Sequence, residues 1–231
     1  MKIALIGYGT MGKLIRTIAE NKGHEIAVVI DESFADSSAT GLAAKLKNAE
    51  VAIDFTVAEA VRRNVEACVE AGVPIVVGTT GWNAQSDDIS QLVRDGGGSM
   101  VFGANFSIGI NLFYRVADFA AELFSKFPEY EAFIEEQHHA RKKDAPSGTA
   151  LKLKDVVSKH LEIGDIAATR AGSIPGTHRL GFDGAADQVL LAHTARSREG
   201  FASGAILAAE WIVGKSGFYE FTAVMDKIVG R

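Results

Sequence analysis

Near its N-terminus the chain reads KIALIGYGTMG (residues 2–12), and the architecture of the first hundred residues follows from this segment. Its apolar part predicts a buried strand over residues 2–6, and three glycines follow at once with the spacing G-x-G-x-x-G. Apolar residues at helical spacing then predict a helix that Gly23 ends, and residues 25–30 predict a second strand that ends at Asp31. This order of strand, glycine turn, helix, strand and acid is typical of a dinucleotide-binding unit.

Each glycine of the turn has a physical role in such a unit. Gly7 permits the tight turn, Gly9 lets the backbone approach a pyrophosphate, and Gly12 allows close packing of helix on strand. The helix start at Thr10 and Met11 then faces the phosphates. The alternative is a glycine turn that serves packing alone.

The acid at the end of the second strand indicates which cofactor is preferred. Asp31 is suited to bond the adenosine ribose hydroxyls of NAD and would repel a 2′-phosphate. Glu32 and Ser33 follow it, so the adjacent arginine that would welcome NADP is missing. We therefore expect NADH as the preferred cofactor, with NADPH possible.

The first half continues with further alternation of strands and helices. Strands are predicted over residues 51–55, 74–77 and 100–102, and helices over 58–71 and around Ile89. Residues 34–50 predict only a short connection rich in Ala and Ser. Ligands of open parallel sheets bind outside the carboxyl ends of the strands. The segments predicted there are Asp54-Phe55-Thr56, Gly78-Thr79-Thr80-Gly81 and Gly103-Ala104-Asn105-Phe106-Ser107.

The second half has a different pattern. A long helix is predicted over residues 108–127, with these apolar side chains expected in the core: Leu112, Phe113, Val116, Phe119, Ala120 and Leu123. Strand-like runs follow at residues 130–137, 169–174, 178–182 and 189–195, which favours a small mixed or antiparallel sheet. A helix is predicted again over residues 203–213, and residues 221–228 are expected to end the chain against the first domain.

These patterns predict an α/β protein of two domains. The first is a Rossmann-like dinucleotide-binding domain formed by residues 1–107 and 204–231. The second is a smaller α+β domain, residues 108–203, with a mixed or antiparallel sheet, and we expect it to bind substrate and carry the catalytic groups.

Composition narrows the range of partners. The 231 residues carry a formal net charge of -5, so the chain offers no overall attraction to nucleic acid or to an anionic membrane surface, and we expect neither as a partner. The single cysteine, Cys68, lies among apolar positions of a predicted helix and excludes an intramolecular disulfide. The first apolar run is too short for a membrane span or a signal peptide, and a cytoplasmic location is expected.

A second informative segment, EQHHARKKDAPSGTA, covers residues 136–150. An alternating run from Tyr130 leads into it as a strand, and Pro146 followed by Ser147-Gly148-Thr149 opens an amphipathic helix. The polar residues therefore lie on a strand-to-helix loop, where chemistry is commonly found. A solvated basic loop is the alternative.

Strand geometry separates the histidines of this segment. Residues two apart share a face, so Glu136 and His138 point together while His139 points away. Adjacent histidines of this kind do not chelate one metal, and we predict no metal site. His138 and Lys142 are the candidate acid-base groups. For His139, a substrate hydrogen bond and a structural role are both open.

The loop also offers groups that bind anions. The backbone N–H groups of Ser147-Gly148-Thr149 at a helix start suit a carboxylate. Arg196 and Arg198 offer a second cationic contact for an anion, whereas Arg141 and Lys143 are expected to be solvent-exposed charges without a role in the site. A basic loop in an acidic chain predicts a small anionic substrate.

Several motifs together resemble one known family, the 4-hydroxy-tetrahydrodipicolinate reductases, or dihydrodipicolinate reductases, of bacterial lysine and diaminopimelate synthesis. The string HHARKKDAPSGTA at 138–150 is the most specific of them. The others are GYGTMG at 7–12, DFT at 54–56, GTTG at 78–81, ANFSIGIN at 104–111, RAG at 170–172, GTH at 176–178 and HTARSREGFASGA at 193–205. The resemblance spans nearly the whole chain.

The resemblance implies an NAD(P)H-dependent reduction of 4-hydroxy-tetrahydrodipicolinate, a small cyclic dicarboxylate, with loss of water and hydride transfer to C4. It implies that His138 and Lys142 are catalytic, Lys142 being the proton donor, and that substrate is held by His139, Gly148, Thr149 and Arg198. On the cofactor side it implies Gly7, Gly9, Thr10, Met11, Gly12, Asp31, Gly78, Thr79, Thr80, Ala104, Asn105 and Phe106. It further implies a homotetramer joined through the sheet of the second domain.

Two other functions stay open from the residues themselves. One is another NAD(P)-linked reductase of a small imino or oxo acid. The other is a nucleotide-sensing module without turnover, in which His138 and Lys142 would have no catalytic role.

Overall fold

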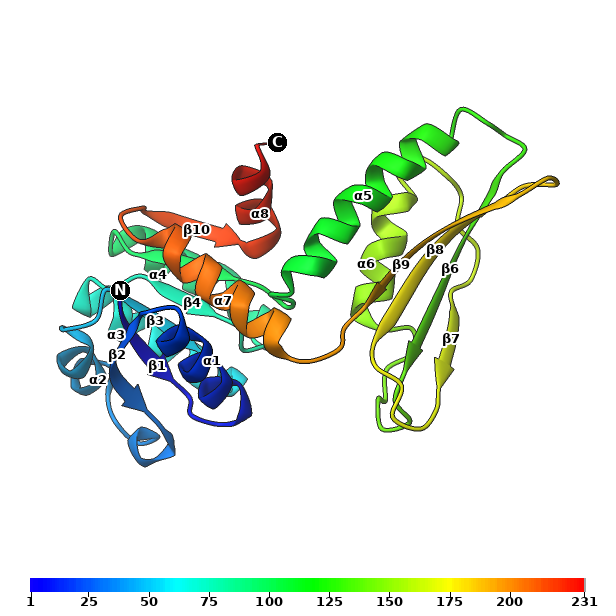
Figure 1. Cartoon of the computed structure of the whole chain (residues 1–231). Helices are drawn as coiled ribbons and strands as arrows, with labels where there is room; N and C mark the ends of the chain where they lie inside the picture. Colours follow the sequence, from blue (N-terminus) through cyan, green and yellow to red (C-terminus); the bar gives the residue numbers. More distant parts are fainter. Residues whose placement is uncertain (231) are drawn as a thin grey trace. The chain divides into compact units, whose positions relative to one another are not determined.

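The computed structural model describes residues 1–230 and divides the chain into two compact units (Figure 1). Unit 1 comprises Met1–Ile108 and the chain from Glu199 onward, and unit 2 comprises Gly109–Arg198. The boundaries expected from the sequence differ from these by one residue at the first crossing and by five at the second. The larger difference arises because helix α7 (Glu199–Ile212) begins before Ser203. Gly200 and Gly204 weaken helix propensity, which obscured its first turn.

Unit 1 contains a six-stranded parallel sheet in the order β10-β5-β4-β3-β1-β2. The strands are β1 (Lys2–Ile6), β2 (Glu25–Ile30), β3 (Val51–Asp54), β4 (Ile75–Val77), β5 (Ser99–Phe102) and β10 (Gly217–Glu220). Because β1 pairs with both β2 and β3, the strand order reverses at β1. The glycine turn that follows β1 therefore lies at the switch point, where ligands of such sheets bind.

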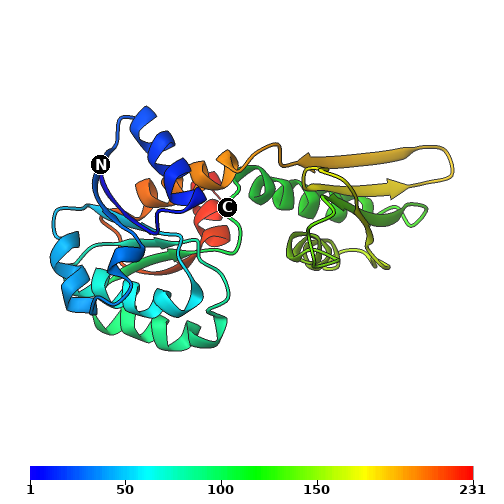
Figure 2. The same cartoon turned by 90° about the horizontal axis from the view of Figure 1, so that it is seen from below.

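Helices cover both faces of this sheet (Figure 2). One face packs against α1 (Thr10–Asn21), α7 and α8 (Phe221–Val229), and the other against α2 (Ala39–Leu46), α3 (Ala58–Ala71) and α4 (Ser86–Asp95). Strands buried on both faces read as continuous apolar runs, which is why β1, β3 and β4 were recognisable in the sequence. The Rossmann-like expectation for this unit is confirmed.

The short connection expected after Asp31 and the segment before α8 both hold elements that the sequence did not predict. A short 3-10 helix, η1 (Glu32–Phe34), follows Asp31, and residues 34–50 contain helix α2, which Ser38 caps by accepting a hydrogen bond from Gly41 N. Leu42, Ala43 and Leu46 bury one face of α2. The unexpected element before α8 is β10, which adds the sixth strand beside β5. Its four residues carry no pattern that separates a strand from a loop.

Unit 2 contains a four-stranded sheet in the order β7-β6-β8-β9, and of the mixed and antiparallel sheets that the sequence left open it is the mixed one. Its strands are β6 (Glu131–His138), β7 (Ala167–Arg170), β8 (Thr177–Asp183) and β9 (Gln188–Thr194). Strand β6 pairs parallel with β7 and antiparallel with β8. Helices α5 (Ile108–Phe124) and α6 (Gly148–Val157) share a core with one face of the sheet that includes Ile134, Leu180 and Phe182.

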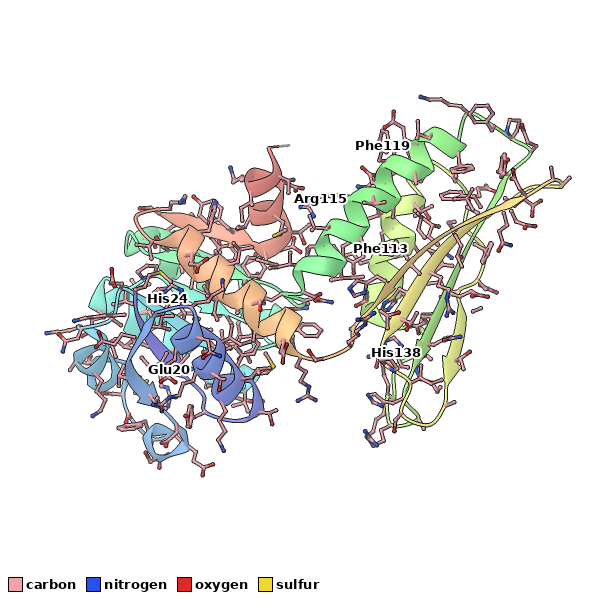
Figure 3. All side chains as sticks on the ribbon, viewed as in Figure 1. Glu20, His24, Phe113, Arg115, Phe119 and His138 are labelled. Atoms are coloured by element: carbon pink, nitrogen blue, oxygen red, sulfur yellow. The ribbon has the colours of Figure 1, made fainter. Side chains whose placement is uncertain are left out.

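Helix α5 corrects one expectation about the core. Phe113 is buried and Ala120 packs against the core, but Leu112, Val116, Phe119 and Leu123 are each at least 40% exposed. Apolar residues surround this helix on more than one side, and only one side faces the sheet (Figure 3). The periodicity therefore could not tell which apolar stripe would be covered. No helix within residues 1–230 has the length and apolarity required to cross a membrane.

Candidate active site

The glycine turn after β1 has the geometry that its spacing predicted. Gly7 has a φ of +91°, and a Cβ there would overlap the Phe55 carbonyl at the end of β3. A Cβ on Gly12 would overlap the Gly7 carbonyl, which explains how closely α1 approaches the turn. Gly9 is exposed, and a Cβ built on it would meet no atom within 4 Å. The turn and packing roles of Gly7 and Gly12 are thus confirmed, and Gly9 leaves open space for a ligand.

The start of α1 opens on a pocket of about 310 Å³ in unit 1. Segments that follow three neighbouring strands line it: Gly9, Thr10 and Met11 after β1, Phe55 and Thr56 after β3, and Gly78, Thr79 and Thr80 after β4. Helix α1 has no acid in its first turn and no side-chain cap. Its first amides therefore suit a phosphate group, such as one of a dinucleotide's pyrophosphate.

A buried carboxylate fastens two of the segments that line this pocket. Asp54 Oδ1 accepts hydrogen bonds from Thr56 N at 2.9 Å, Thr56 Oγ1 at 2.7 Å and Thr79 Oγ1 at 2.8 Å, while Oδ2 accepts from Asn64 Nδ2 at 2.8 Å. The side chain is completely buried. Burial raises the pKa of Asp54, and the hydrogen bonds from Asn64, Thr56 and Thr79 oppose that rise.

The other predicted cofactor residues lie outside the pocket lining. Asp31 is exposed at the end of β2, where its Oδ1 accepts from Ser33 N at 3.0 Å and Ser33 Oγ at 2.6 Å. These hydrogen bonds lower the pKa of Asp31 and orient its carboxylate. Ala104 and Asn105 follow β5, and the Asn105 side chain accepts from Ser107 N at 2.9 Å. Phe106 belongs to the core, stacked on Phe221, so its side chain is unavailable to a ligand.

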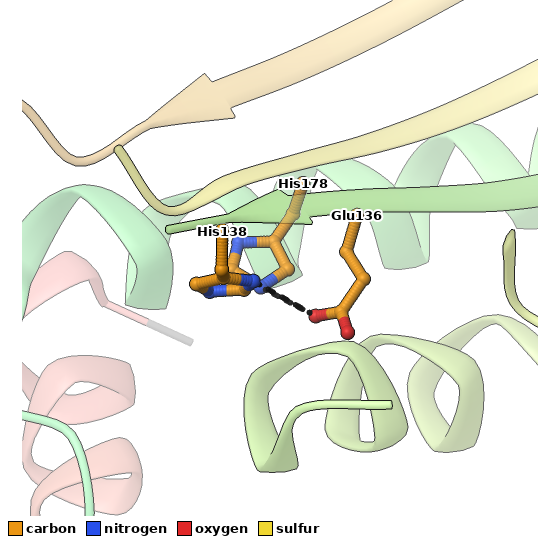
Figure 4. Close-up of side chains that lie close together, drawn as sticks. All are labelled: Glu136, His138 and His178. Carbon is orange, nitrogen blue, oxygen red and sulfur yellow. Dashed lines mark ion pairs between the residues drawn. The ribbon is translucent and has the colours of Figure 1, made fainter. Parts of the chain in front are cut away.

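In unit 2, strand pairing brings a polar cluster to one face of the sheet, and Figure 4 shows three of its members, Glu136, His138 and His178. Glu136 and His138 share a face of β6, as predicted, and strand pairing sets His178 of β8 opposite Glu136 and Arg170 of β7 opposite His138. Glu136 Oε2 lies 3.4 Å from His138 Nδ1 and 3.6 Å from His178 Nε2. The two imidazole rings meet edge to face, with centroids 5.2 Å apart.

Glu136 is the centre of this cluster and its side chain is fully buried. Its Oε1 accepts hydrogen bonds from Ser147 N at 2.9 Å and from Arg170 Nη2 at 2.5 Å, and its Oε2 accepts from the Ser147 hydroxyl. Burial alone would raise the pKa of Glu136, but the hydrogen bonds from Ser147 and Arg170 bring that pKa below its usual value. The carboxylate is therefore ionised at neutral pH.

The two histidines of the cluster are neutral at neutral pH. Burial lowers the pKa of His138, which the Glu136 charge partly offsets and the charges of Lys142 and Arg170 reinforce. Burial, followed by the influence of His138, lowers the pKa of His178 to about 4. Neutral His138 can therefore exchange a proton with a ligand without first losing one to solvent.

Lys142 lies on the loop between β6 and α6 and is about a quarter exposed. Its Nζ forms an ion pair with Asp144 Oδ1 at 2.8 Å, and the hydrogen bond from Lys142 lowers the pKa of Asp144. Arg170 Nη2 also donates to the Asp144 carbonyl at 2.6 Å. The guanidinium thus connects Glu136 with the loop that carries Lys142.

The predicted substrate residues are only partly brought together. Gly148 is exposed at the start of α6, which Ser147 caps by accepting from Ala150 N at 3.2 Å, and the Thr149 carbonyl accepts from Tyr114. His139 follows the last residue of β6, and its Nδ1 is buried without a hydrogen-bond partner among the described residues. Arg198 is exposed at the last position of unit 2, apart from this cluster.

The structure adds residues that the sequence did not assign. Arg170, His178 and Asp144 join the cluster through strand register and loop geometry, and Ser147 joins it through its side chain as well as its amide. Arg170 and His178 lie within the RAG and GTH motifs, but these motifs do not reveal which residue of β6 pairs with each of them. The only sequence signal for the cluster was the alternation that sets Glu136 and His138 on one face of β6.

One group within residues 1–230 presents ligand atoms close enough for a metal ion, and it is Glu136, His138 and His178. Both oxygens of the carboxylate already accept hydrogen bonds, from Arg170 on one side and the Ser147 hydroxyl on the other. A metal ion bound to Glu136 would displace the guanidinium of Arg170 from this buried carboxylate. The geometry thus favours proton transfer over metal binding, and the absence of a metal stays a prediction.

Comparison with known proteins agrees with this geometry. Residues 1–106 match the family described as dihydrodipicolinate reductase, N-terminus, and residues 109–225 match dihydrodipicolinate reductase, C-terminus. The 4-hydroxy-tetrahydrodipicolinate reductase of Christiangramia forsetii is 32% identical over 99% of this chain and 99% of its own length. The protein of the same name from Archaeoglobus fulgidus is 34% identical over 95% and 97%. A solved structure, a dipicolinate-bound dihydrodipicolinate reductase from Paenisporosarcina sp. TG-14, shares the fold with a TM-score of 0.78 over 95% of this chain and 97% of that one, at 23% identity.

A glycine turn with helix amides that suit a phosphate, at the switch point of one sheet, and a cluster of titratable side chains on another are features expected of an oxidoreductase that uses a nicotinamide dinucleotide. The full-length matches make the assignment specific. The chain belongs to the dihydrodipicolinate reductase family. The resemblance noted in the sequence, the fold class and the enzymatic character are therefore confirmed.

Proposed function

We propose that this chain reduces 4-hydroxy-tetrahydrodipicolinate to tetrahydrodipicolinate, with loss of water, as a step of diaminopimelate and L-lysine biosynthesis. The observation that carries the proposal is the assembly of His138, the Lys142–Asp144 ion pair and the start of α6 around one buried carboxylate. This assembly combines a proton donor with amides that suit a carboxylate. The relatives described above carry the name of this activity.

The substrate is a cyclic dicarboxylate, and one of its carboxylates binds at the start of α6. Gly148 is exposed there, and the Ser147 side chain caps the helix by accepting from the amide of Ala150. His139, the residue that follows β6, and the exposed Arg198 are further candidates for holding the substrate.

Proton delivery is assigned to Lys142. After the C4 hydroxyl leaves as water, the ring holds a C=C bond between C4 and the carbon next to the C=N carbon, and a hydride at C4 with a proton at that neighbouring carbon completes the reduction. The bound nicotinamide would supply the hydride. Lys142, held by Asp144 at 2.8 Å, exchanges that partner for the substrate and gives its proton to the enamine carbon next to C4. His138, neutral at working pH, orients and polarises the substrate.

On the cofactor side, NADH is the preferred donor and NADPH a possible one. The first amides of α1, next to the open space at Gly9, hold the pyrophosphate. The segments Gly78–Thr80 and Ala104–Phe106 contact the remainder of the cofactor, Phe106 through its backbone only. Asp31, oriented by Ser33, accepts from the ribose hydroxyls.

The activity is tested by measuring NADH oxidation with enzymatically generated 4-hydroxy-tetrahydrodipicolinate. Substrate-dependent oxidation with formation of tetrahydrodipicolinate is the expected result. Oxidation with other imino or oxo acids but not with this substrate would assign another reductase. Binding of NADH without turnover on any of them would assign a sensor.

The enzyme is further proposed to be a cytoplasmic homotetramer joined through the sheet of unit 2. Strand β9 is an edge strand, and Leu190 on it is 48% exposed, on the same face of the sheet as Phe133. An exposed apolar edge of this kind requires cover to avoid aggregation. Leu190→Glu is expected to yield dimers or monomers in light scattering, with Glu162→Gln as a surface control. An unchanged tetramer, or a monomeric wild type, would contradict this assembly.

A further inference from the structure

We propose that Glu136 is a positioning residue for the reaction, because it sets the tautomer and orientation of His138 and at the same time fixes the start of α6. A single carboxylate would then hold the group that polarises the substrate at a constant distance from the amides that bind it. This inference rests on the functions proposed above for His138 and α6. Glu136 itself is buried and does not touch the substrate.

The first step of the argument concerns the Nδ1 atom of His138. This atom is buried and makes no hydrogen bond within the described residues, and the carboxylate oxygen Glu136 Oε2 lies 3.4 Å from it, within ion-pair distance. An ionised carboxylate only accepts hydrogen bonds, so a proton on Nδ1 is stabilised and a lone pair there is not. His138 therefore carries its proton on Nδ1 and directs the free lone pair of Nε2 away from the carboxylate.

The second step concerns the surroundings of Nε2. A Cβ built on Gly176 would lie 3.1 Å from His138 Nε2, so any larger residue at this position would crowd that atom. A glycine there keeps Nε2 accessible beside the turn before β8. The imidazole is thus held at one nitrogen by Glu136 and left accessible at the other, as a proton-exchanging histidine requires.

The third step explains why His178 does not compete for the same carboxylate. The Ser147 hydroxyl donates to Glu136 Oε2, and Ser147 Oγ lies 3.2 Å from His178 Nε2, which can donate to it. With a pKa of about 4, His178 stays neutral. It packs edge to face on His138, at 71° between the rings, and supports the orientation of that ring.

The fourth step concerns α6 and the Lys142 loop. Glu136 accepts from both the amide and the hydroxyl of Ser147, the residue that caps α6. Arg170, which neutralises Glu136, also donates to the Asp144 carbonyl. Loss of the carboxylate should therefore disturb substrate affinity through Ser147 and turnover through His138, and not one of them alone.

The test is Glu136→Gln, with Glu135→Gln as the matched control. Glu135 is the next residue on β6, on the opposite face, where it pairs with Arg179 at 3.7 Å. The amide of E136Q sets an NH₂ group against His138 Nδ1 or against Arg170, which favours the opposite tautomer of His138. We expect kcat to fall by about two orders of magnitude and KM for the substrate to rise in E136Q, and both to stay within about twofold of wild type in E135Q.

A second readout does not depend on turnover. Nitrogen NMR of labelled histidine reports the tautomer and the titration midpoint of His138. We expect a proton on Nδ1 in the wild type, and a midpoint at lower pH in E136Q, since the Glu136 charge raises the pKa that burial lowers. The charged and titratable groups that surround this ring are Glu136, Arg170, His178, Lys142 and Asp144.

The outcomes separate this inference from the proposed function. If wild type fails to turn over the substrate, the proposed function fails, and the NMR titration still decides whether Glu136 governs His138. If wild type is active while E136Q keeps wild-type kcat or an unmoved His138 midpoint, Glu136 is structural and the inference is wrong. If E136Q does not fold, the NMR measurement on the wild type still tests the inference. A proton on Nε2 of His138 in the wild type would show that the inference is wrong.

Discussion

Asp54 in unit 1 and Glu136 in unit 2 are the two buried acidic side chains of residues 1–230, and their surroundings differ in charge. Neutral donors surround Asp54, from two threonines and an asparagine, and burial raises its pKa. Arg170, His138 and His178 lie around Glu136, and its pKa is lowered. A carboxylate among neutral donors fixes loops, whereas one beside an arginine and two titratable histidines can govern proton transfer. From this difference we infer that Asp54 maintains the shape of the pocket in unit 1, whereas Glu136 supports proton transfer in unit 2.

The largest effect is expected at the proton donor of unit 2. Lys142→Ala should lower kcat by about two or more orders of magnitude, the usual contribution of a positioned acid, while the Kd for NADH stays near wild type. Steady-state kinetics and NADH fluorescence measure the two quantities. Lys143→Ala, an exposed neighbour, is the control. Near-normal turnover in K142A would show that Lys142 is not the proton donor. It would also contradict the inference that unit 2 supplies the proton chemistry.

The next effect concerns the stability of unit 1. Asp54→Ala removes the acceptor of the Thr56 and Thr79 hydroxyls and the nearer of the two acceptors of the Asn64 amide, and buried donors left unsatisfied in this way cost about 3 kcal/mol together. Urea unfolding measures the loss, and Asp36→Ala, at an exposed acid, serves as control. The Kd for NADH should rise as well, since Thr56 and Thr79 line the pocket. Unchanged stability would mean that neutral donors do not fasten these loops.

A smaller effect is expected for cofactor choice. Asp31→Ala should weaken NADH about tenfold, the loss expected for hydrogen bonds to a charged acceptor, and should weaken NADPH less. Fluorescence titration with both cofactors gives the two Kd values, and Glu32→Ala is the neighbouring control. Equal losses for NADH and NADPH would argue against a contact between Asp31 and the ribose.

The smallest effect separates the two carboxylates by the sign of their pH dependence. Glu136, with a folded pKa below 4.5, contributes stability above that value that is lost as pH falls through the folded pKa. Asp54, with a folded pKa above 3.8, behaves in the opposite way, and its contribution is lost as pH rises toward the folded pKa. Over about pH 3 to 5, E136Q should therefore remove a positive slope of unfolding free energy against pH, and D54N a negative one. Slopes of the same sign in both difference curves would contradict the comparison.

Much of the site could be predicted because its signals are local. The spacing of Gly7, Gly9 and Gly12 reports on a turn within one segment, and alternation on β6 correctly set Glu136 and His138 on one face. Arg170 and His178 reach the same face from strands more than thirty residues away in the chain. Their pairing depends on register, which no single-strand pattern encodes.

The sequence by itself determined the dinucleotide-type turn, the mixed second sheet and the His138–Lys142 loop, because each depends on the periodicity or chemistry of neighbouring residues. Tertiary structure alone decided that Glu136 would be ionised while buried, since Arg170 and Ser147 reach it from other elements. It also decided which side of α5 would be covered, and that β10 would pair with β5. Each of these features depends on which elements pack against one another, and that packing is set by the whole fold and not by neighbouring residues in the sequence.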